Sequence, residues 1–311
     1  MKILLPSTEH VSLLRLCAVV LAAVVVLDSC AVMGAASKLQ TVLSSEEDPE
    51  LAAAALPTFL MAAEALLEAD PGNQDKVVTA ASLYVMYGNA FVQGPASSLP
   101  DERFEERKIQ YDRAGALYRR AFRLLSGALD RHSPGLVEAA VAGKADLSLF
   151  KKADVPLLYW SAVSVLAGFG LNPLDFKSAH YLGTGPLFLA RAAELDPGWN
   201  GGAIYSIWLS YYAGMPSYLG GDLAKAETAY QKALAYSKGG SASLFVSYAS
   251  SICIPKEDYE GFKAALAKAL AINPNAVPES RLETVLAQKN ARRLLADAGQ
   301  YFTLPEREQT P

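Results

Sequence analysis

The chain has 311 residues, of which 51% are hydrophobic and 19% are charged, and its formal net charge is −4. A chain of this length and composition can bury a large core, which argues against an extended disordered tether. We expect no nucleic-acid partner, because binding to phosphates needs a clustered excess of Lys and Arg.

The N-terminal residues have the pattern of a secretion signal. A run of twelve uncharged residues, Leu16 to Leu27, follows the basic residues Lys2 and Arg15. This run is too short for a helix that crosses a membrane, but it has the length of a signal-peptide core. We therefore predict that residues 1–29 are a signal peptide.

The residues at the end of this leader resemble a bacterial lipobox. Leu27 lies three residues before Cys30, and the small residue Ser29 directly precedes the cysteine. Asp28 departs from the pattern, in which that position is usually small and uncharged, and an ordinary leader cleaved nearby is the alternative. Acylation at Cys30 would hold the protein on a membrane by two or more acyl chains, with residues 30–48 as the lipidated N-terminus and tether.

Residues 49–304 are predicted to form one helical domain, followed by a C-terminal tail at 305–311. Pro49 and Glu50 open an apolar helical run in which Pro57 either kinks the helix or marks its start. Pro and Gly together end helices, so the run should stop at the Asp-Pro-Gly-Asn sequence that begins at residue 70.

The next run has the spacing of the first helix of a tetratricopeptide unit. Tyr84, the pair Tyr87 and Gly88, and then Phe91 follow one another at intervals of about three residues. The glycine leaves room for a second helix to approach. The segment 94–100, which begins with Gly-Pro, is predicted to be a loop.

A long helix is predicted over residues 101–129. Ala114, Tyr118 and Ala121 have the small–large–small spacing of the second helix of the same repeat unit. Three arginines near the end of this helix are predicted to form a solvated face rather than a binding patch. They are Arg119, Arg120 and Arg123.

A short phrase recurs between residues 192 and 275. Ala-Ala-Glu-Leu-Asp-Pro ends at Pro197, Ala-Tyr-Gln-Lys-Ala-Leu-Ala begins at Ala229, and Ala-Lys-Ala-Leu-Ala-Ile-Asn-Pro ends at Pro274. A period of about 35 to 40 residues is typical of stacked helix pairs. We therefore predict an all-α fold, an irregular tetratricopeptide-like helical solenoid.

The C-terminal helices can be bounded by their turn residues. Asp222 is placed to cap a helix that begins at Leu223. Residues 241–252 and 259–272 should form the next pair of helices. Residues 278–295 are predicted to be a final amphipathic helix that packs as a cap on the last repeat.

A second pattern in this region is more specific than the repeat. It consists of Leu195-Asp196-Pro197, Gly202-Ala203, Tyr212-Ala213, Pro216 and Gly220-Gly221-Asp222 with Lys225-Ala226. This run resembles the T component of TPR-protein-associated TRAP transporters, the TatT family. The Met-Pro…Gly-Gly-Asp connection is its discriminating part, since the other phrases also occur in ordinary tetratricopeptide repeats.

The resemblance covers about residues 30–302 and implies a secreted, lipid-anchored helical protein of the periplasm that is not an enzyme. It implies that the partner is the periplasmic substrate-binding protein of a TRAP transporter and that the protein assembles as a homotrimer around a central cavity or pore. The ligand that it implies is small, and apolar or carboxylate-bearing. We expect no cofactor.

No pattern of catalytic or metal-binding residues is visible. His132 and His180 are far apart and neither lies in an HExxH arrangement, so no metal site is predicted. Cys253 lies between two isoleucines and is predicted to be a buried structural thiol. No GxSxG nucleophile motif is present.

Aromatic residues on the predicted first helices are the candidate groove for a ligand or partner. In a solenoid such helices line the concave face, where aromatic rings offer an apolar surface that can also form hydrogen bonds. Packing between helices is the alternative, and it explains Tyr211 and Tyr218 least. The set is Tyr84, Tyr87, Tyr159, Trp160, Tyr205, Trp208, Tyr211, Tyr212 and Tyr218.

The function that we predict is a lipid-anchored accessory subunit of a TRAP-type solute importer, which docks the binding protein and channels its ligand. The alternative is a tetratricopeptide scaffold lipoprotein for envelope assembly, unrelated to transport. A helical hydrolase is a third hypothesis, and it needs a convergent polar site that the sequence does not show.

Overall fold

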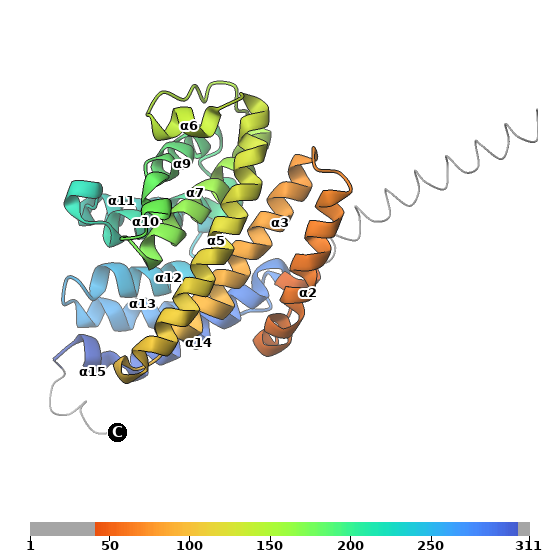
Figure 1. Cartoon of the computed structure of the whole chain (residues 1–311). Coiled ribbons are helices and arrows are strands. Elements are labelled where there is room, and N and C mark those ends of the chain that lie inside the picture. The colour runs from red at the N-terminus through yellow and green to blue at the C-terminus, as the bar shows by residue number, and fades with distance from the viewer. Residues whose placement is uncertain (1–40, 304–311) are drawn as a thin grey trace, which may run out of the picture.

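In the computed structural model, residues 41–303 are described, and over this range the chain is helical with no β-strand (Figure 1). The predicted all-α class is therefore confirmed. The signal peptide, the lipobox with Cys30 and the C-terminal tail all lie outside the described residues. Whether the helix pairs repeat the tetratricopeptide geometry stays a prediction.

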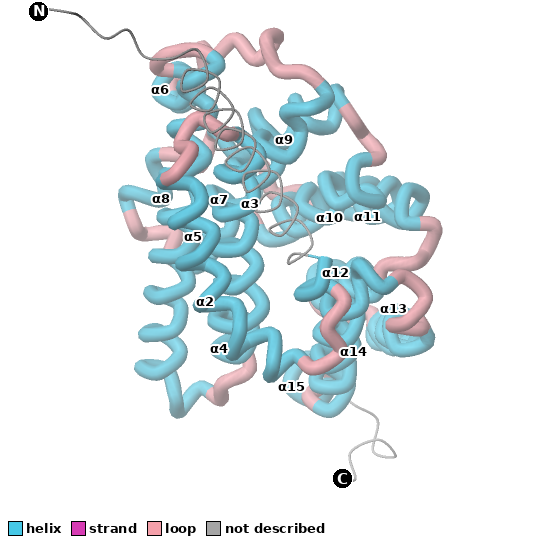
Figure 2. The backbone as a smooth tube through the Cα atoms, turned by 90° about the vertical axis from the view of Figure 1, so that its right-hand side faces the viewer, coloured by secondary structure: helices cyan, strands magenta, loops and turns pink. Residues whose placement is uncertain are grey.

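The first half of the fold is built around a long central helix, α5, which packs against α3 on one side and α7 on the other. The short segments α6 and α8 lie beside it, and α9 packs on α7 (Figure 2). The helices of this half are α2 (Pro49–Glu68), α3 (Gln74–Tyr87), α4 (Gly94–Ser97), α5 (Phe104–His132), α6 (Leu136–Val141), α7 (Val155–Leu171), α8 (Phe176–His180) and α9 (Thr184–Leu195).

The second half consists of two layers of helices. Both views show the α10–α11 pair stacked on the α12–α13 pair, with α14 packed against α12 and α13 (Figures 1 and 2). The predicted packing of the last helix on the last pair is thus confirmed. The helices are α10 (Trp199–Gly214), α11 (Leu223–Ser237), α12 (Ala242–Tyr248), α13 (Tyr259–Ala271), α14 (Arg281–Ala296) and α15 (Ala298–Tyr301).

Two hydrophobic clusters form the core, one in each half. Ile204 of α10 is fully buried in the first cluster, and Leu209 of the same helix is fully buried in the second. Trp208 is half-buried and packs against both clusters. The middle of α10 is therefore where the two halves of the core are joined.

The first described helix, α2, begins at Pro49 as predicted. The side chain of Asp48 accepts hydrogen bonds from the backbone N–H groups of Glu50 (2.9 Å) and Leu51 (3.1 Å). Pro57 lies inside the helix, so the possibility that it marks the start was wrong. The cap at Asp48 sets the start, because it supplies acceptors for N–H groups that have no partner within the helix.

The packed part of the chain begins before Pro49, which corrects the predicted extent of the tether. Leu43 is only 5% exposed and belongs to the first core cluster. The carbonyl of Ser45 accepts a hydrogen bond from Arg281 of α14 at 3.1 Å. A hydrogen bond therefore joins the segment that precedes α2 to α14, a helix near the C-terminus.

The segment 94–100 was predicted to be a loop, and this was wrong for residues 94–97. The chain leaves α3 through a π-helical turn, Gly88–Gln93, and continues directly into α4. Pro95 lies in the first turn of α4, where a missing N–H group costs no hydrogen bond. Gly-Pro therefore continues the helical path here instead of breaking it.

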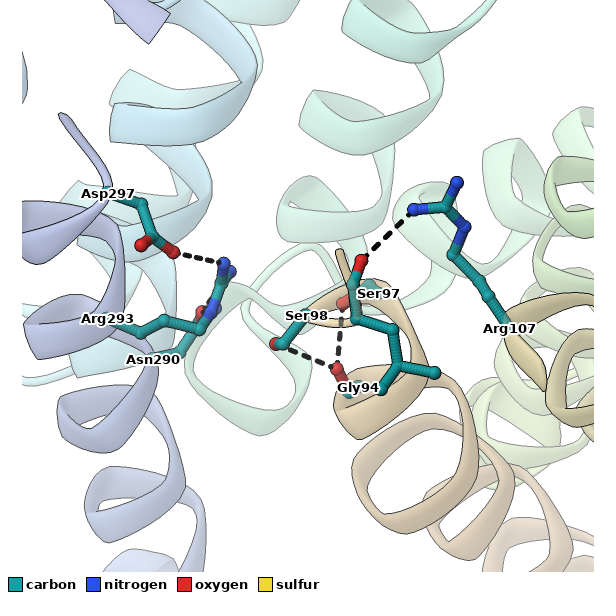
Figure 3. A network of polar contacts seen from close by, with 8 residues as sticks. Gly94, Ser97, Ser98, Arg107, Asn290, Arg293 and Asp297 are labelled. Atoms are coloured by element: carbon teal, nitrogen blue, oxygen red, sulfur yellow. Dashed lines mark hydrogen bonds and ion pairs between the residues drawn. The ribbon is translucent and has the colours of Figure 1, made fainter. Parts of the chain in front are cut away.

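The end of α4 and the turn into α5 are held by local hydrogen bonds. Ser97 and Ser98 both donate to the carbonyl of Gly94, at 2.8 and 3.3 Å (Figure 3). Arg107, one turn into α5, donates to the carbonyl of Leu99 at 3.1 Å. These bonds satisfy carbonyl groups that the short helix leaves without partners.

A second group of polar contacts closes the end of α14. Arg293 donates to Asn290 at 2.8 Å and to Asp297, the residue between α14 and α15, at 3.2 Å (Figure 3). The ion pair spans four residues and is about one-third exposed. It fixes the direction in which the chain leaves α14.

The contact between α3 and α5 follows the predicted packing code. A methyl group at Gly88 would lie 3.0 Å from a ring carbon of Tyr118, and Ala114 and Ala121 flank that ring without any exposed surface. The hydroxyl of Tyr118 donates to the side chain of Gln93 at 2.6 Å. The prediction that Gly88 admits the second helix is confirmed.

Two helices are long and apolar enough to cross a membrane when judged by length and composition alone. They are α2 and the segment Lys152–Leu171, which contains α7. In the second, 67% of the apolar window is buried inside the fold, so its hydropathy reflects its place in the core. The corresponding value for α2 is 22%.

Candidate functional site

The first turn of α10 has an unusual backbone. Asn200, Gly201 and Gly202 all have positive φ angles, of 46°, 63° and 87°. A methyl group at Gly202 would lie 2.8 Å from Cβ of Tyr236 on α11 and 3.3 Å from the backbone of Ala233. Glycine is required here both by the left-handed conformation and by the close approach of α11.

A row of aromatic side chains runs along α10 from this point. Tyr205, Trp208 and Tyr212 are three and four residues apart, so they share one face of the helix. The rings of Trp208 and Tyr212 are stacked with centroids 5.0 Å apart. Tyr205 is stacked on Tyr236 of α11 at 5.7 Å with nearly parallel rings. All three rings of α10 are half-buried, so each keeps part of its surface in solvent.

Two lysines of α11 border this aromatic row. The ammonium group of Lys232 lies 5.2 Å from the ring centre of Tyr205, and that of Lys225 lies 5.8 Å from the ring centre of Tyr212. These are cation–π distances. Burial raises the pKa of Tyr205, and the neighbouring Tyr236 adds to this effect. Like any tyrosine near neutral pH, Tyr205 has a protonated phenol that can donate a hydrogen bond.

Tyr211 lies next to the row and holds the connection to α11. Its hydroxyl donates to the carbonyl of Leu219 at 2.7 Å. Its ring meets Trp208 and Tyr212 edge to face, with centroids 5.6 and 5.5 Å away. Burial, and then the proximity of Tyr212, raises the pKa of Tyr211. Tyr211, one of the two residues that packing periodicity explained least, therefore holds the loop against α10.

The structure explains Gly221 and Asp222 of the Gly-Gly-Asp sequence in that connection. The N–H group of Asp222 donates to the carbonyl of Tyr212 at 2.8 Å, which brings the loop back onto α10. A methyl group at Gly221 would lie 1.6 Å from the carbonyl oxygen of Met215, so no side chain fits. The carboxylate of Asp222 accepts from the N–H groups of Ala224 and Lys225 at 2.9 and 3.1 Å. The predicted cap is confirmed.

The two aromatic residues of α3 in the predicted groove are part of the core, which corrects their assignment to it. Tyr84 is 4% exposed, and its ring is covered by the guanidinium of Arg120 at 5.0 Å. The guanidinium of Arg120 in turn donates a hydrogen bond to the carboxylate of Glu64 on α2. Tyr87 is also buried, and its hydroxyl accepts a hydrogen bond from Arg113 at 3.0 Å. Both rings fill space between α3 and α5 and offer little surface to a ligand.

The predicted residues on α7 are likewise separate from the row. Tyr159 is buried and packs against Trp199 at the start of α10, with centroids 4.6 Å apart. Trp160 is half-buried and packs against the first core cluster. Of the aromatic residues predicted to form a groove, only those on α10 therefore lie together. Tyr218 lies on the turn Ser217–Leu219 and is 83% exposed.

A pocket that the sequence analysis missed lies between α5, α6, α7 and α8. Its volume is about 660 Å³. Arg119 and Arg123, which were predicted to form a solvated face, both line it, together with Lys177 and Phe176 of α8. No sequence signal pointed to this pocket, because its lining residues come from four separate helices.

The other predictions about chemistry concern single residues. Cys253 is a free thiol with no exposed surface, so the prediction of a buried thiol is confirmed. Burial raises the pKa of this thiol to about 11. Among residues 41–303 there is no group of three or more His, Cys, Asp or Glu side chains that could hold a metal ion.

The part of the chain that contains this site matches a known protein family. A family model described as TRAP transporter T-component matches residues 45–302. The chain belongs to this family. It is also 35% identical over 266 residues to an uncharacterized protein of Treponema pallidum (strain Nichols), and this match covers 84% of the chain and 82% of the relative.

Membership of the TRAP transporter T-component family places the chain among the accessory proteins of a transport system. This supports transport over the alternative of an envelope-assembly scaffold. The matched region begins a few residues after the first described residue and ends one residue after α15. The α10 row, the Gly-Gly-Asp connection and the α5–α8 pocket all lie inside it.

Proposed function

We propose that this T component is a non-enzymatic accessory subunit that docks the periplasmic substrate-binding protein of a TRAP transporter through the aromatic row of α10. The observation that carries the proposal is the arrangement of Tyr205, Trp208 and Tyr212 as half-buried rings on one helix face, bordered by Lys225 and Lys232.

Such a surface has the composition of a protein-binding hot spot. Tyr and Trp are enriched where partners bind, because a large ring is buried on binding at a small cost in side-chain entropy. The rings here are already held by stacking, which lowers the cost of ordering them further. The two lysines favour a partner that presents acidic residues around an apolar centre.

The proposal includes the place where docking happens. Acylation of Cys30 would hold the protein on a membrane as a periplasmic lipoprotein, and two acyl chains suffice for stable anchoring. We further propose that the subunit acts as a homotrimer, so that three such rows face the binding protein. Passage of a small apolar or carboxylate-bearing ligand beside Trp208 is part of the same hypothesis.

The experiment is a binding titration between the mature lipoprotein in detergent and a TRAP substrate-binding protein from the same organism. We expect association at micromolar concentrations, and Lys232→Glu together with Tyr236→Ala should weaken it about tenfold or more. Both residues are exposed, so the fold should tolerate the changes. Lys144→Glu, on an exposed turn of the first half, is the matched control.

Two outcomes would contradict the proposal. One is the absence of association at micromolar concentrations with wild-type protein. The other is equal loss of binding for Lys232→Glu and Lys144→Glu, which would show that net charge matters and the α10 row does not. The trimer is tested separately, by sedimentation of the same preparation.

A further inference from the structure

The pocket between α5 and α8 has an apolar floor. Phe122 and Val165 reach its base with 8% and 5% of their surface exposed, above the fully buried Tyr118. Phe176 and Tyr181 are its more exposed apolar residues, and Gly168 keeps the α7 side of it open. The ring of Tyr181, at the end of α8, lies 5.0 Å from that of Phe122. A volume of about 660 Å³ is in the range of small-molecule sites. The floor is therefore suited to an alkyl or aromatic group.

The pocket also carries cationic groups. Arg119 is paired with Asp175 at 3.5 Å. Arg123 and Lys177 line the pocket from α5 and α8, and neither has an ion-pair partner within residues 41–303. Two cations on facing helices, beside an apolar floor, are the arrangement that an anion with an apolar tail would use.

Acidic groups in the same lining limit the charge of that anion. Asp130 accepts a hydrogen bond from the N–H group of Val137 at 3.1 Å, which keeps its carboxylate in place beside α6. Glu138 lies 3.9 Å from His180. These two carboxylates, of which Glu138 is largely exposed, would repel a doubly charged phosphate more than a singly charged head group.

We propose that the α5–α8 pocket binds a singly charged amphiphilic anion, with its tail on the Phe122–Val165 floor and its carboxylate or sulfonate head between Arg123 and Lys177. This site shares no residue with the α10 row. It does not require that the protein docks a binding protein, so the two proposals can fail separately.

The first test compares head groups on one tail. The probes are octanoate, octanesulfonate, octanol and octylammonium, each titrated into the full lipoprotein by calorimetry. Phe176 is 89% exposed at the pocket, so Phe176→Trp should fold normally and report binding by its fluorescence. We expect both anions to bind about tenfold or more tightly than octanol, and octylammonium to bind weakest.

The second test uses charge variants with a matched control. Arg123→Gln and Lys177→Gln should each weaken octanoate binding about tenfold and leave octanol binding unchanged. Arg292→Gln removes the same charge from an exposed position of α14 and should change neither. Equal binding of all four probes, or equal effects of Arg123→Gln and Arg292→Gln, would overturn the proposal.

Two further measurements separate this site from nonspecific binding to apolar surface and from binding to membranes. A methyl group at Gly168 would meet its nearest neighbours at 3.8 Å, so Gly168→Ala should fold, and Gly168→Leu should extend into the pocket and abolish octanoate binding. Unchanged octanoate binding by a folded Gly168→Leu protein would contradict the proposal. Association with phosphatidylglycerol vesicles is measured on a Cys30→Ser chain, which carries no acyl anchor. If Arg123→Gln abolished this association but left octanoate binding intact, the pocket would serve a lipid surface and the proposal would be contradicted.

Discussion

Gly202 of α10 lies directly against Tyr236 of α11, since a methyl group at Gly202 would lie 2.8 Å from Cβ of Tyr236. The same tyrosine stacks on Tyr205, so this contact positions the first ring of the aromatic row. The packing of two backbones thus determines the spacing of a surface that we propose for partner binding.

Gly202→Ala is expected to destabilise the fold. The residue has a φ angle of 87°, and the added methyl group would also meet Tyr236 and Ala233. The two effects together should lower the free energy of unfolding by about 3 kcal/mol, measured by urea denaturation. Gly214→Ala, at the other end of α10, has no atom within 4 Å and is the control. Equal effects of the two variants would contradict the assigned role of Gly202.

Trp208 is expected to couple the two halves of the core. Trp208→Ala should lower the free energy of unfolding by about 2 kcal/mol, since the side chain is half-buried. It should also reduce hydrogen-exchange protection both in α7 and in α12, because Trp208 packs against both clusters. Trp160→Ala is the matched control, since Trp160 packs only against the first cluster. If hydrogen-exchange protection in Trp208→Ala fell in only one of the two halves of the core, the coupling would be refuted.

The Asp222 cap is expected to depend on pH. Hydrogen bonds from the backbone, led by the N–H group of Lys225, hold the pKa of Asp222 below its usual range. The stabilisation is therefore fully present above the unfolded pKa of about 4 and is lost as the pH falls through the lower folded value. Asp222→Asn keeps an acceptor oxygen that does not titrate in this range. The difference in thermal midpoint between wild type and Asp222→Asn should shrink or reverse in that window, and a constant difference would count against the cap.

Cys253 is expected to be unreactive in the folded protein. Burial raises the pKa of its thiol to about 11, so almost no thiolate is present at pH 8. In a chain with Cys17→Ser and Cys30→Ser, a thiol reagent should label Cys253 only after urea unfolding. Rapid labelling of native protein at pH 8 would show that α12 and the following π-helical turn open readily.

The sequence predicted the helical scaffold because local rules govern it. Gly88 and Tyr118 follow the small-against-large code, and Asp222 has the side chain and position of a helix cap. The errors occur where a local rule has more than one outcome. Gly94-Pro95 can end a helix or begin one, and Leu43 looked like part of a polar tether until its packing partners were known.

The candidate sites were less predictable. Tyr84 and Tyr205 both lie at first-helix positions, yet one is buried under Arg120 and the other keeps an exposed face. Periodicity shows which helix face a ring lies on, but it does not show what covers that face. The pocket at Arg123 and Lys177 required knowledge of which helices are neighbours, and no spacing in the sequence carries that information.

The hydrogen bond between Arg281 and Ser45 limits how far the folded part of the chain can lie from an acylated Cys30. Leu43 is already packed into the body, so if Cys30 carries the acyl chains, about a dozen residues separate the lipid from the folded part. A fully extended chain of that length spans at most about 45 Å. The contact between Ser45 and α14 would then lie within about 45 Å of the bilayer, and a partner would meet this side of the protein in that layer.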